Sequence, residues 1–272
     1  MSEFKINGKM VKYAGATGQI DAYLAEPAGE GRFPAIVLVH EIFGLNKHIM
    51  SVADSFSRQG YVVLAPHLFS SGYAPPGMTE ENINMTMKFF MSLPPEKQRD
   101  MEFVQASLSK YDEDKRAVIQ SLMGSMFSLP RQKLAEELSS GVDFLNGMGN
   151  VSRGAVGSAG FCFGGAMSAE LACTGKTAAS VIFYGQNPEP LDRVRNINGP
   201  VLGLYGGLDK RINEHIHELV KALVDFDKVF EIVVYKGAAH AFFNDTGRNY
   251  KEEAAKDARE RVLKFFSANL KK

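Results

Sequence analysis

The sequence predicts an α/β protein in which a mainly parallel β-sheet is covered by helices on both faces. Two observations favour this class. Short apolar runs alternate with stretches of helical spacing along most of the chain, as expected when crossover helices join parallel strands. Several runs are also apolar at nearly every position, for example residues 34–40 (PAIVLVH), and such runs are typical of strands buried on both faces of a sheet.

The individual strands are predicted from these apolar runs, and the helices from apolar residues that recur every three or four positions. Val52 and Phe56, for example, share one side of a helix that Gly60 ends, and Ala254 and Ala258 share one side of the last helix. The strands are expected at residues 9–13, 19–24, 34–40, 61–65, 154–159, 178–184, 200–205 and 229–235. The helices are expected at residues 49–59, 132–148, 163–173, 213–226 and 249–270.

Residues 68–131 interrupt this alternation. They contain 7 of the 12 methionines, two Pro-Pro pairs, and charged stretches of helical character near residues 80–91 and 95–122. A loop of this length without secondary structure would be unusual in a compact domain. The segment is therefore predicted to be a helical insertion within one domain that spans residues 1–272. Its methionines either pack inside the insertion or form the inner face of a lid over a substrate.

The composition excludes several classes of protein. The chain has 31 Lys plus Arg and 31 Asp plus Glu, so it has no net charge that would hold nucleic acid. It has neither a run of about 18 apolar residues that could cross a membrane nor the apolar stretch of a signal peptide near residue 1. With 45% hydrophobic and 23% charged residues, it resembles an ordinary globular protein, and its oligomeric state is not indicated.

The two cysteines are predicted to be free. Cys173 lies 11 residues along the helix expected after Cys162, which is a rise of roughly 16 Å. A disulfide needs Cα atoms within about 7 Å. Free thiols suit a reducing cytoplasm, which is the expected location. No cofactor and no metal ion is expected.

Cys162 stands at the centre of a short glycine-rich motif. The sequence G-F-C-F-G at residues 160–164 has the G-x-S-x-G spacing with Cys in place of Ser. That pattern marks a tight turn between a strand and a helix that presents a nucleophile. The helix N-terminus also favours the thiolate over the thiol. The alternative is a small buried apolar cysteine, as most free cysteines are, so other residues have to decide.

A nucleophilic cysteine needs a general base and a group that orients the base. His240 follows the strand at residues 229–235 through a loop of small residues, at the sheet edge where such proteins carry their sites. Asp209 follows the strand at residues 200–205, although an Asp there could instead cap the next helix. Because the order nucleophile, acid, histidine is the one expected, Cys162, Asp209 and His240 are predicted to form a catalytic triad.

Three other residues compete for these roles. His215 and His217 fall within a predicted helix and point to different faces of it, so a solvated position suits them better than a ligand or partner role. Asp245 lies five residues after His240, in a sequence more typical of a turn or a helix cap.

The segment H-E-I-F-G at residues 40–44 follows a strand at the place where half of an oxyanion hole is expected. The backbone N–H groups of Ile42 and Phe163 are the predicted donors, and His40 is predicted to be structural. A Glu41 carboxylate beside a buried strand end is costly unless it has a partner or a role. Five residues are expected to line a substrate pocket: Phe43, Phe161, Tyr205, Phe242 and Asn244.

Four segments together resemble the dienelactone hydrolase (carboxymethylenebutenolidase) family of the α/β-hydrolase superfamily. They are H-E-I-F-G at residues 40–44, G-F-C-F-G-G at 160–165, G-L-D at 207–209 and H-A-F at 240–242. The resemblance implies an α/β-hydrolase fold and a triad of Cys162, His240 and Asp209. It also implies that Glu41 contacts the resting thiol and helps to deprotonate it when substrate arrives. The implied reaction is hydrolysis of an enol-lactone ester bond through an acyl-thioester intermediate.

The chain departs from the family pattern where the substrate would bind. Members that act on dienelactone hold the substrate carboxylate with arginines, one of them four residues after the catalytic histidine, where this chain has Asn244. Another is expected after the strand at residues 61–65, yet residues 67–95 contain no arginine. The reaction class is therefore better supported than the substrate.

The predicted activity is hydrolysis of an ester or lactone bond by the Cys162 thiolate. His240 would protonate the leaving alkoxide and then activate water. A thiolate suits activated esters, such as enol lactones, better than amides. The main alternative is a broad short-chain carboxylesterase or thioesterase that uses the same triad.

Two classes outside the hydrolases are disfavoured. A redox sensor that uses Cys162 would not need Asp209 or His240 in register. A nucleotide-binding protein is disfavoured because residues 157–160 (GSAG) lack the spacing of a dinucleotide-binding loop.

Overall fold

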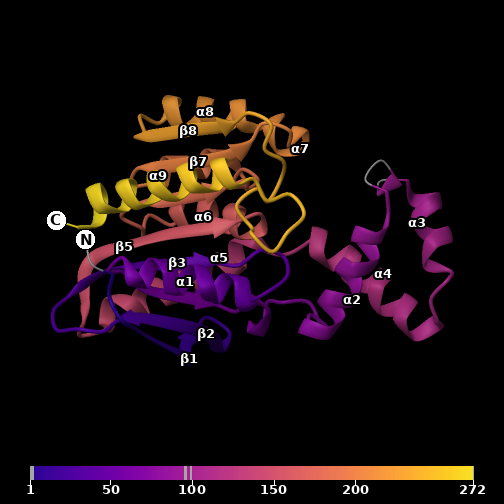
Figure 1. Ribbon diagram of the computed structural model, residues 1–272, viewed down its shortest axis with the longest axis horizontal. Helices are drawn as coiled ribbons and strands as arrows, with labels where there is room; N and C mark the ends of the chain where they lie inside the picture. Colours follow the sequence, from indigo (N-terminus) through magenta and orange to yellow (C-terminus); the bar gives the residue numbers. More distant parts are fainter. Residues whose placement is uncertain (1–2, 95–96, 99, 272) are drawn as a thin grey trace.

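The computed structural model describes residues 3–94, 97–98 and 100–271. Within these residues the chain forms an eight-stranded sheet with the order β1-β2-β4-β3-β5-β6-β7-β8 (Figure 1). The strands are β1 Ile6–Gly15, β2 Gly18–Pro27, β3 Phe33–Val39, β4 Val62–Pro66, β5 Val151–Phe161, β6 Ser180–Phe183, β7 Val201–Gly206 and β8 Phe230–Tyr235. β1 and β2 form an antiparallel hairpin that also pairs antiparallel with β4, and the pairs from β4 to β8 are parallel. The predicted mainly parallel sheet is confirmed.

Helices cover both faces of the sheet. α1 and α9 pack with one face, whereas α5, α6 and α8 pack with the other (Figure 1). The helices around the sheet are α1 Lys47–Arg58, α5 Arg131–Gly147, α6 Phe163–Ala172, α7 Lys210–Asn213, α8 Ile216–Asp225 and α9 Glu252–Leu270. The connections include the short 3₁₀ helices η1 Leu68–Ser70 and η3 Leu191–Asn196.

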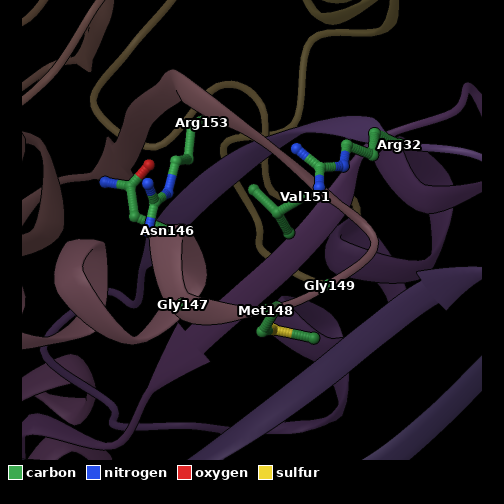
Figure 2. A pocket seen from close by; sticks show the side chains of 7 residues that line it. All are labelled: Arg32, Asn146, Gly147, Met148, Gly149, Val151 and Arg153. Carbon is green, nitrogen blue, oxygen red and sulfur yellow. The ribbon is translucent and has the colours of Figure 1, made fainter.

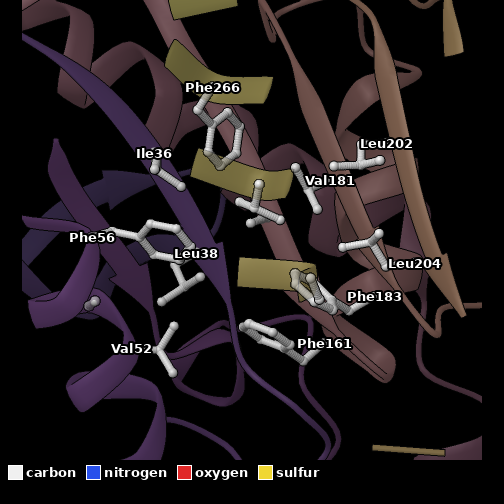
Figure 3. Packing of buried hydrophobic residues seen from close by; sticks show 14 of the residues in the cluster. Ile36, Leu38, Val52, Phe56, Phe161, Val181, Phe183, Leu202, Leu204 and Phe266 are labelled. Atoms are coloured by element: carbon white, nitrogen blue, oxygen red, sulfur yellow. The ribbon is translucent and has the colours of Figure 1, made fainter. Parts of the chain in front are cut away.

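Several large aromatic side chains lie in the core between the sheet and helices α1 and α9. Figure 3 shows Phe56 of α1 and Phe266 of α9 turned toward the strands, where Phe161 and Phe183 lie. The ring centroids of Phe56 and Phe266 are 6.3 Å apart, and those of Phe161 and Phe183 are 4.6 Å apart. Large buried rings such as these give a core much of its apolar area. This core fixes the ends of β5 and β6, from which the site is built.

In the described residues, three helices form an insertion that projects beyond the sheet. They are α2 Glu80–Ser92, α3 Met101–Leu108 and α4 Glu113–Phe127, and they lie to one side of the sheet and its covering helices in Figure 1. One apolar cluster, which we call the insertion core, contains buried residues of these helices and their flanks: Phe89, Leu93, Val104, Leu108 and Ile119. A second cluster joins the insertion to the rest of the chain and is described with the site below.

Two helical predictions differ from the structure. The helical stretch predicted near residues 95–122 forms two helices in its described part, because Asp112 accepts a hydrogen bond from the Lys115 N–H at 3.0 Å and so caps the start of α4 as a new helix. Residues 95, 96 and 99 of this stretch lie outside the described residues. The helix predicted at residues 213–226 corresponds to α8, which begins later, at Ile216, and the short helix α7, which was not predicted, precedes it. At the end of α7, the Asn213 side chain donates a hydrogen bond of 2.8 Å back to the Gly206 carbonyl at the end of β7. This bond holds α7 against the strand end.

No helix in the described part of the chain is both long enough and apolar enough to span a lipid bilayer. Both cysteines are free thiols.

Candidate active site

Cys162 occupies a strained turn between β5 and α6. Its φ of 56° and ψ of −114° lie in a region that residues with a side chain rarely adopt. The flanking glycines make this turn feasible because other backbone lies against them. A Cβ on Gly160 would collide with the carbonyl of Gly164, and a Cβ on Gly164 would collide with the carbonyls of Val39 and His40. The glycine spacing of the motif therefore follows from close backbone packing around the cysteine.

His240 and Asp209 are joined by a hydrogen bond at the carboxyl edge of the sheet. The bond links His240 Nδ1 to Asp209 Oδ2. Asp209 is the third residue after β7 and is largely buried, but its side chain makes no capping bond to α7. The structure therefore favours the partner of a histidine over the helix cap that the sequence left open. The His240 ring is also close enough to Cys162 for the thiolate to raise its pKa, so the three predicted triad residues lie together.

The pKa of His240 is raised from 6.5 to about 10. Burial opposes the charged imidazolium, but the negative charges of Cys162 and Asp209, and hydrogen bonds to both, more than offset this effect. At neutral pH the ring is therefore protonated. The His240 ring packs against Tyr184, with 5.1 Å between the ring centroids, and Asn249 fixes the backbone of His240 by donating a 2.9 Å hydrogen bond to its carbonyl.

Glu41 is buried and has a neutral partner. The Asn244 Nδ2 group donates a hydrogen bond of 2.7 Å to Glu41 Oε2. Asn244 is itself oriented, because its Oδ1 accepts hydrogen bonds from the backbone N–H and the hydroxyl of Thr246, at 3.0 and 2.7 Å. Burial raises the pKa of Glu41, and the bond from Asn244 and the charges of His48 and His240 offset this only in part.

The residues that competed for the triad lie elsewhere. Asp245 pairs with the His48 ring at 3.1 Å, and its side chain is 67% exposed. His215 and His217 are exposed at the start of α8. None of these three residues contacts His240 or Cys162 through a bond that the structure shows among its described residues.

The two predicted oxyanion donors belong to two separate segments, the turn after β3 and the start of α6. Phe163 is the first residue of α6, and Ile42 lies in a tight turn in which the Gly44 N–H donates to the Glu41 carbonyl at 3.1 Å. Gly44 has a φ of +78°, which favours glycine in this turn. The side chains of Ile42 and Phe163 belong to an apolar cluster, which we call the junction cluster. Its buried members are Phe69, Met78, Ile83 and Leu122, and Met87 and Met126 pack against it. The junction cluster thus connects both residues to α2 and α4.

Three of the residues expected in a substrate pocket are core residues instead. Phe161 and Phe242 are buried in the core on the α1–α9 face, and Tyr205 is buried on the opposite face near α8. Each lies close to the triad in the sequence, but the strand residues Phe161 and Tyr205 point to the faces of the sheet and not to its edge. Phe242 lies in the loop after β8 and packs into the core. Phe43 is half-buried in the turn after β3, and Asn244 lies in the site as the partner of Glu41.

Sequence reasoning missed two supporting residues. Tyr184 packs on His240, and Thr246 orients Asn244. Tyr184 follows the end of β6 and could have been found, because several residues that follow strand ends form this site. Thr246 carries no comparable signal.

A separate surface hollow of about 210 Å³ lies at the opposite end of the sheet (Figure 2). It is bordered by the end of α5 and the starts of β3 and β5, and its lining residues include Arg32, Asn146 and Arg153. It contains none of the triad residues. In the described part of the chain, no group of three or more His, Cys, Asp or Glu side chains is arranged to hold a metal ion.

Known proteins share this sequence and fold. The sequence profile of the Dienelactone hydrolase family matches residues 20–270. A protein of Saccharolobus solfataricus named "Putative carboxymethylenebutenolidase" is 37% identical over 260 residues, which cover 94% of this chain and 97% of that protein. A Klebsiella pneumoniae crystal structure named "Putative Dienelactone Hydrolase" has a TM-score of 0.74 at 26% identity, and covers 97% of this chain and 99% of its own. The Pyrococcus horikoshii acylaminoacyl peptidase shares the fold at a TM-score of 0.63 and 15% identity, over 100% of this chain and 43% of the peptidase.

Proposed function

Because the chain belongs to the dienelactone hydrolase family of α/β-hydrolases and is a hydrolase of ester or lactone bonds in small molecules, we propose that it acts through a triad of Cys162, His240 and Asp209. The observation that carries the proposal is the strained turn at Cys162, which stands beside a histidine whose other nitrogen is bonded to a buried aspartate. Strain at a single residue with a side chain is typical of functional sites. A base oriented by an acid is what a thiol nucleophile requires.

In the proposed acylation step, the Cys162 thiolate attacks the carbonyl carbon of the ester. The negative charge moves to the carbonyl oxygen, where the N–H groups of Ile42 and Phe163 bind it. His240 is protonated at neutral pH, and its Nδ1 is occupied by Asp209. Its Nε2 therefore gives a proton to the departing alkoxide as the C–O bond breaks, which leaves an acyl thioester and a neutral imidazole.

In the proposed deacylation step, the neutral His240 takes a proton from water as the water oxygen attacks the thioester. The C–S bond then breaks, the carboxylic acid leaves, and the thiolate and imidazolium form again. Asp209 stays ionised throughout and stabilises the imidazolium.

We propose that Glu41 assists in forming the thiolate. A carboxyl group that is buried and has a raised pKa can exchange a proton with a nearby thiol at neutral pH. Asn244 donates to only one of its oxygens, so the other oxygen can serve this exchange. The need for a free thiol also favours a reducing compartment such as the cytoplasm.

The substrate is proposed to be an enol lactone or another activated ester. The bond between Asn244 and Glu41 favours a second candidate, a broad short-chain carboxylesterase or thioesterase. Asn244 stands where a cation would be needed to hold a substrate carboxylate, and its amide is already engaged on both sides. A panel of p-nitrophenyl butyrate, its carboxylated counterpart p-nitrophenyl succinate, an acyl thioester and a dienelactone separates these candidates by kcat/KM.

The nucleophile is tested by replacing the thiol. Cys162→Ala is expected to lower kcat/KM on p-nitrophenyl butyrate by at least about 10³-fold, the order expected when a nucleophile is lost. Rapid mixing of the wild-type enzyme with excess ester, followed by an acid quench and mass spectrometry, should show the acyl group on Cys162. Cys173→Ala is the matched control and should leave kcat unchanged. Full activity of Cys162→Ala would exclude the mechanism.

A further inference from the structure

One peptide group carries both the Glu41 carbonyl and the Ile42 N–H that the proposed mechanism uses to bind the oxyanion. The carbonyl accepts two hydrogen bonds, from His40 Nδ1 at 2.6 Å and from the Gly44 N–H at 3.1 Å. A peptide group is planar, with its N–H opposite its C=O. The bonds that fix the direction of the Glu41 carbonyl therefore fix the direction of the Ile42 N–H as well.

The protonation of His40 follows from its second hydrogen bond. The Leu68 backbone N–H donates to His40 Nε2 at 3.1 Å. A ring nitrogen that accepts a hydrogen bond carries no proton, so in the neutral ring the proton lies on Nδ1, from which it is donated to the Glu41 carbonyl. His40 is fully buried, and this burial lowers its pKa to about 3. The ring therefore stays neutral at any pH at which the protein would be assayed.

The surroundings of His40 hold its ring in one orientation. Its ring centroid lies 4.9 Å from that of Phe69 and 6.0 Å from that of Phe163, the residue that supplies the other predicted oxyanion donor. Its bond to Leu68 reaches η1, the first element after β4 on the way to the insertion. One buried ring thus contacts both halves of the predicted oxyanion hole and the start of the inserted segment.

We propose that His40 is a positioning residue for the oxyanion hole, and that its neutral ring aims the Ile42 N–H at the developing oxyanion by holding the Glu41 carbonyl. This inference rests on the proposed function and deepens it. A donor that is already oriented needs no reorganisation when charge develops, which is the condition under which such donors accelerate acyl transfer. The bonds to the carbonyl also polarise the peptide and strengthen its N–H as a donor.

Two substitutions of His40 separate its two hydrogen bonds. In His40→Asn, the side-chain amide places an N–H near the position of Nδ1 and keeps the donor to Glu41, but it loses the acceptor for Leu68. In His40→Gln, the longer side chain reaches the position of Nε2, keeps an acceptor for Leu68 and loses the donor to Glu41. We expect His40→Gln to lower kcat on p-nitrophenyl butyrate by about 10- to 100-fold with little change in KM, and His40→Asn to stay within about threefold of the wild type.

A second reaction of the same thiol shows whether the oxyanion hole is the cause. Alkylation of Cys162 by iodoacetamide needs the thiolate but forms no oxyanion. Its rate should therefore be the same in His40→Gln, His40→Asn and the wild type. Equal losses of kcat in the two variants, or a parallel fall of hydrolysis and alkylation in His40→Gln, would overturn the proposal. Failure of the proposed function looks different, because Cys162→Ala would then retain hydrolysis.

The tautomer of His40 can be measured in the wild-type protein, so the test does not depend on the folding of a variant. Nitrogen-15 NMR of histidine-labelled protein should show one neutral ring that is protonated at Nδ1. Its chemical shifts should not change between about pH 5 and 9, although an ordinary histidine titrates in this range. The His40→Asn variant assigns that signal by its loss. A His40 ring protonated at Nε2 would have no donor for the Glu41 carbonyl, and the proposal would be wrong.

Discussion

Asp209 helps to set the pH range over which His240 is protonated, because its carboxylate is hydrogen-bonded to the His240 ring. The raised pKa of His240 favours the folded state, because the imidazolium is more stable in the folded chain than in the unfolded chain. This contribution is fully present below the unfolded pKa of about 6.5 and is lost as the pH rises through about 10. His240 also loses the proton that it donates to the leaving group as the pH rises through about 10.

Replacing Asp209 should move this range. In Asp209→Asn, the negative charge that helps to raise the pKa of His240 is absent, so the alkaline limb of kcat/KM should shift to lower pH. The rate at neutral pH should fall by about 10²- to 10⁴-fold, because the ring also loses the acceptor that fixes its tautomer. Asp245→Asn is the control, since that carboxylate is exposed and pairs with His48. A pH profile of kcat/KM checks both variants, and an unmoved alkaline limb in Asp209→Asn would contradict the assignment.

A single residue of the site could be predicted where its place follows from the sequence immediately around it. Cys162, Asp209 and His240 each follow a strand run that is visible in the sequence, and their shared edge follows from parallel strands. The partner of Glu41 could not be predicted in this way. Asn244 and Glu41 are distant in the sequence, and their bond depends on how the loop after His240 folds over the turn after β3.

At the scale of elements, the insertion is connected to the site through side chains. The insertion core holds residues of α2, α3 and α4 together, whereas the junction cluster includes Ile42 and Phe163. Leu122 of α4 belongs to the junction cluster, and Ile119, one turn earlier on the same helix, belongs to the insertion core. Both side chains are buried, at 2% and 0% exposure, so they form a matched pair.

Shortening each of these two side chains should show which of them affects activity as well as stability. Ile119→Ala and Leu122→Ala should each cost about 2–5 kcal/mol of packing free energy. Only Leu122→Ala should also change kcat or KM on p-nitrophenyl butyrate, by several-fold, because it loosens the packing beside the oxyanion donors. Steady-state kinetics and thermal unfolding of the two variants make the comparison. Equal kinetic effects would mean that the junction cluster has no special connection to the site.

The helices and strands could be predicted more completely than the points at which individual helices begin and end. Each predicted strand and each covering helix has a counterpart, because their apolar patterns match the burial that the structure shows. The new helix start at Asp112 and the short helix α7, which ends at Asn213, were missed. Each depends on a polar side chain that bonds to backbone, either capping a new helix or bonding back to a strand end, and apolar periodicity does not record such bonds.

For the whole molecule, the packing of α9 closes one face of the sheet. Phe266 is fully buried against Phe56 and Tyr61, whereas its neighbour Phe265 is only half-buried. Phe266→Ala should lower the free energy of unfolding by about 3–5 kcal/mol, and Phe265→Ala should lower it by clearly less. Denaturant unfolding measures both. Phe266 packs beside Gly157 in the middle of β5, and not at the carboxyl edge of the sheet where the triad lies. The kcat of the folded fraction should therefore not change, and a loss of kcat without a loss of stability would contradict this account.

The sheet as a whole could be predicted only in outline. The apolar runs predicted a mainly parallel sheet, but they do not specify that β2 pairs antiparallel with β4 or that β3 lies between β4 and β5. Strand order is decided by which faces the connecting helices must cover, and this is a property of the complete molecule.

The site residues come from the carboxyl ends of strands that are far apart in the chain. Glu41 follows β3, Cys162 follows β5, Asp209 follows β7 and His240 follows β8. No local segment can therefore carry activity, and the long loops between these residues must close before the thiol meets its base. Contacts of such high sequence separation form slowly. During refolding, ester hydrolysis should be among the last signals to return, so the enzyme's own turnover reports that the sheet has been completed.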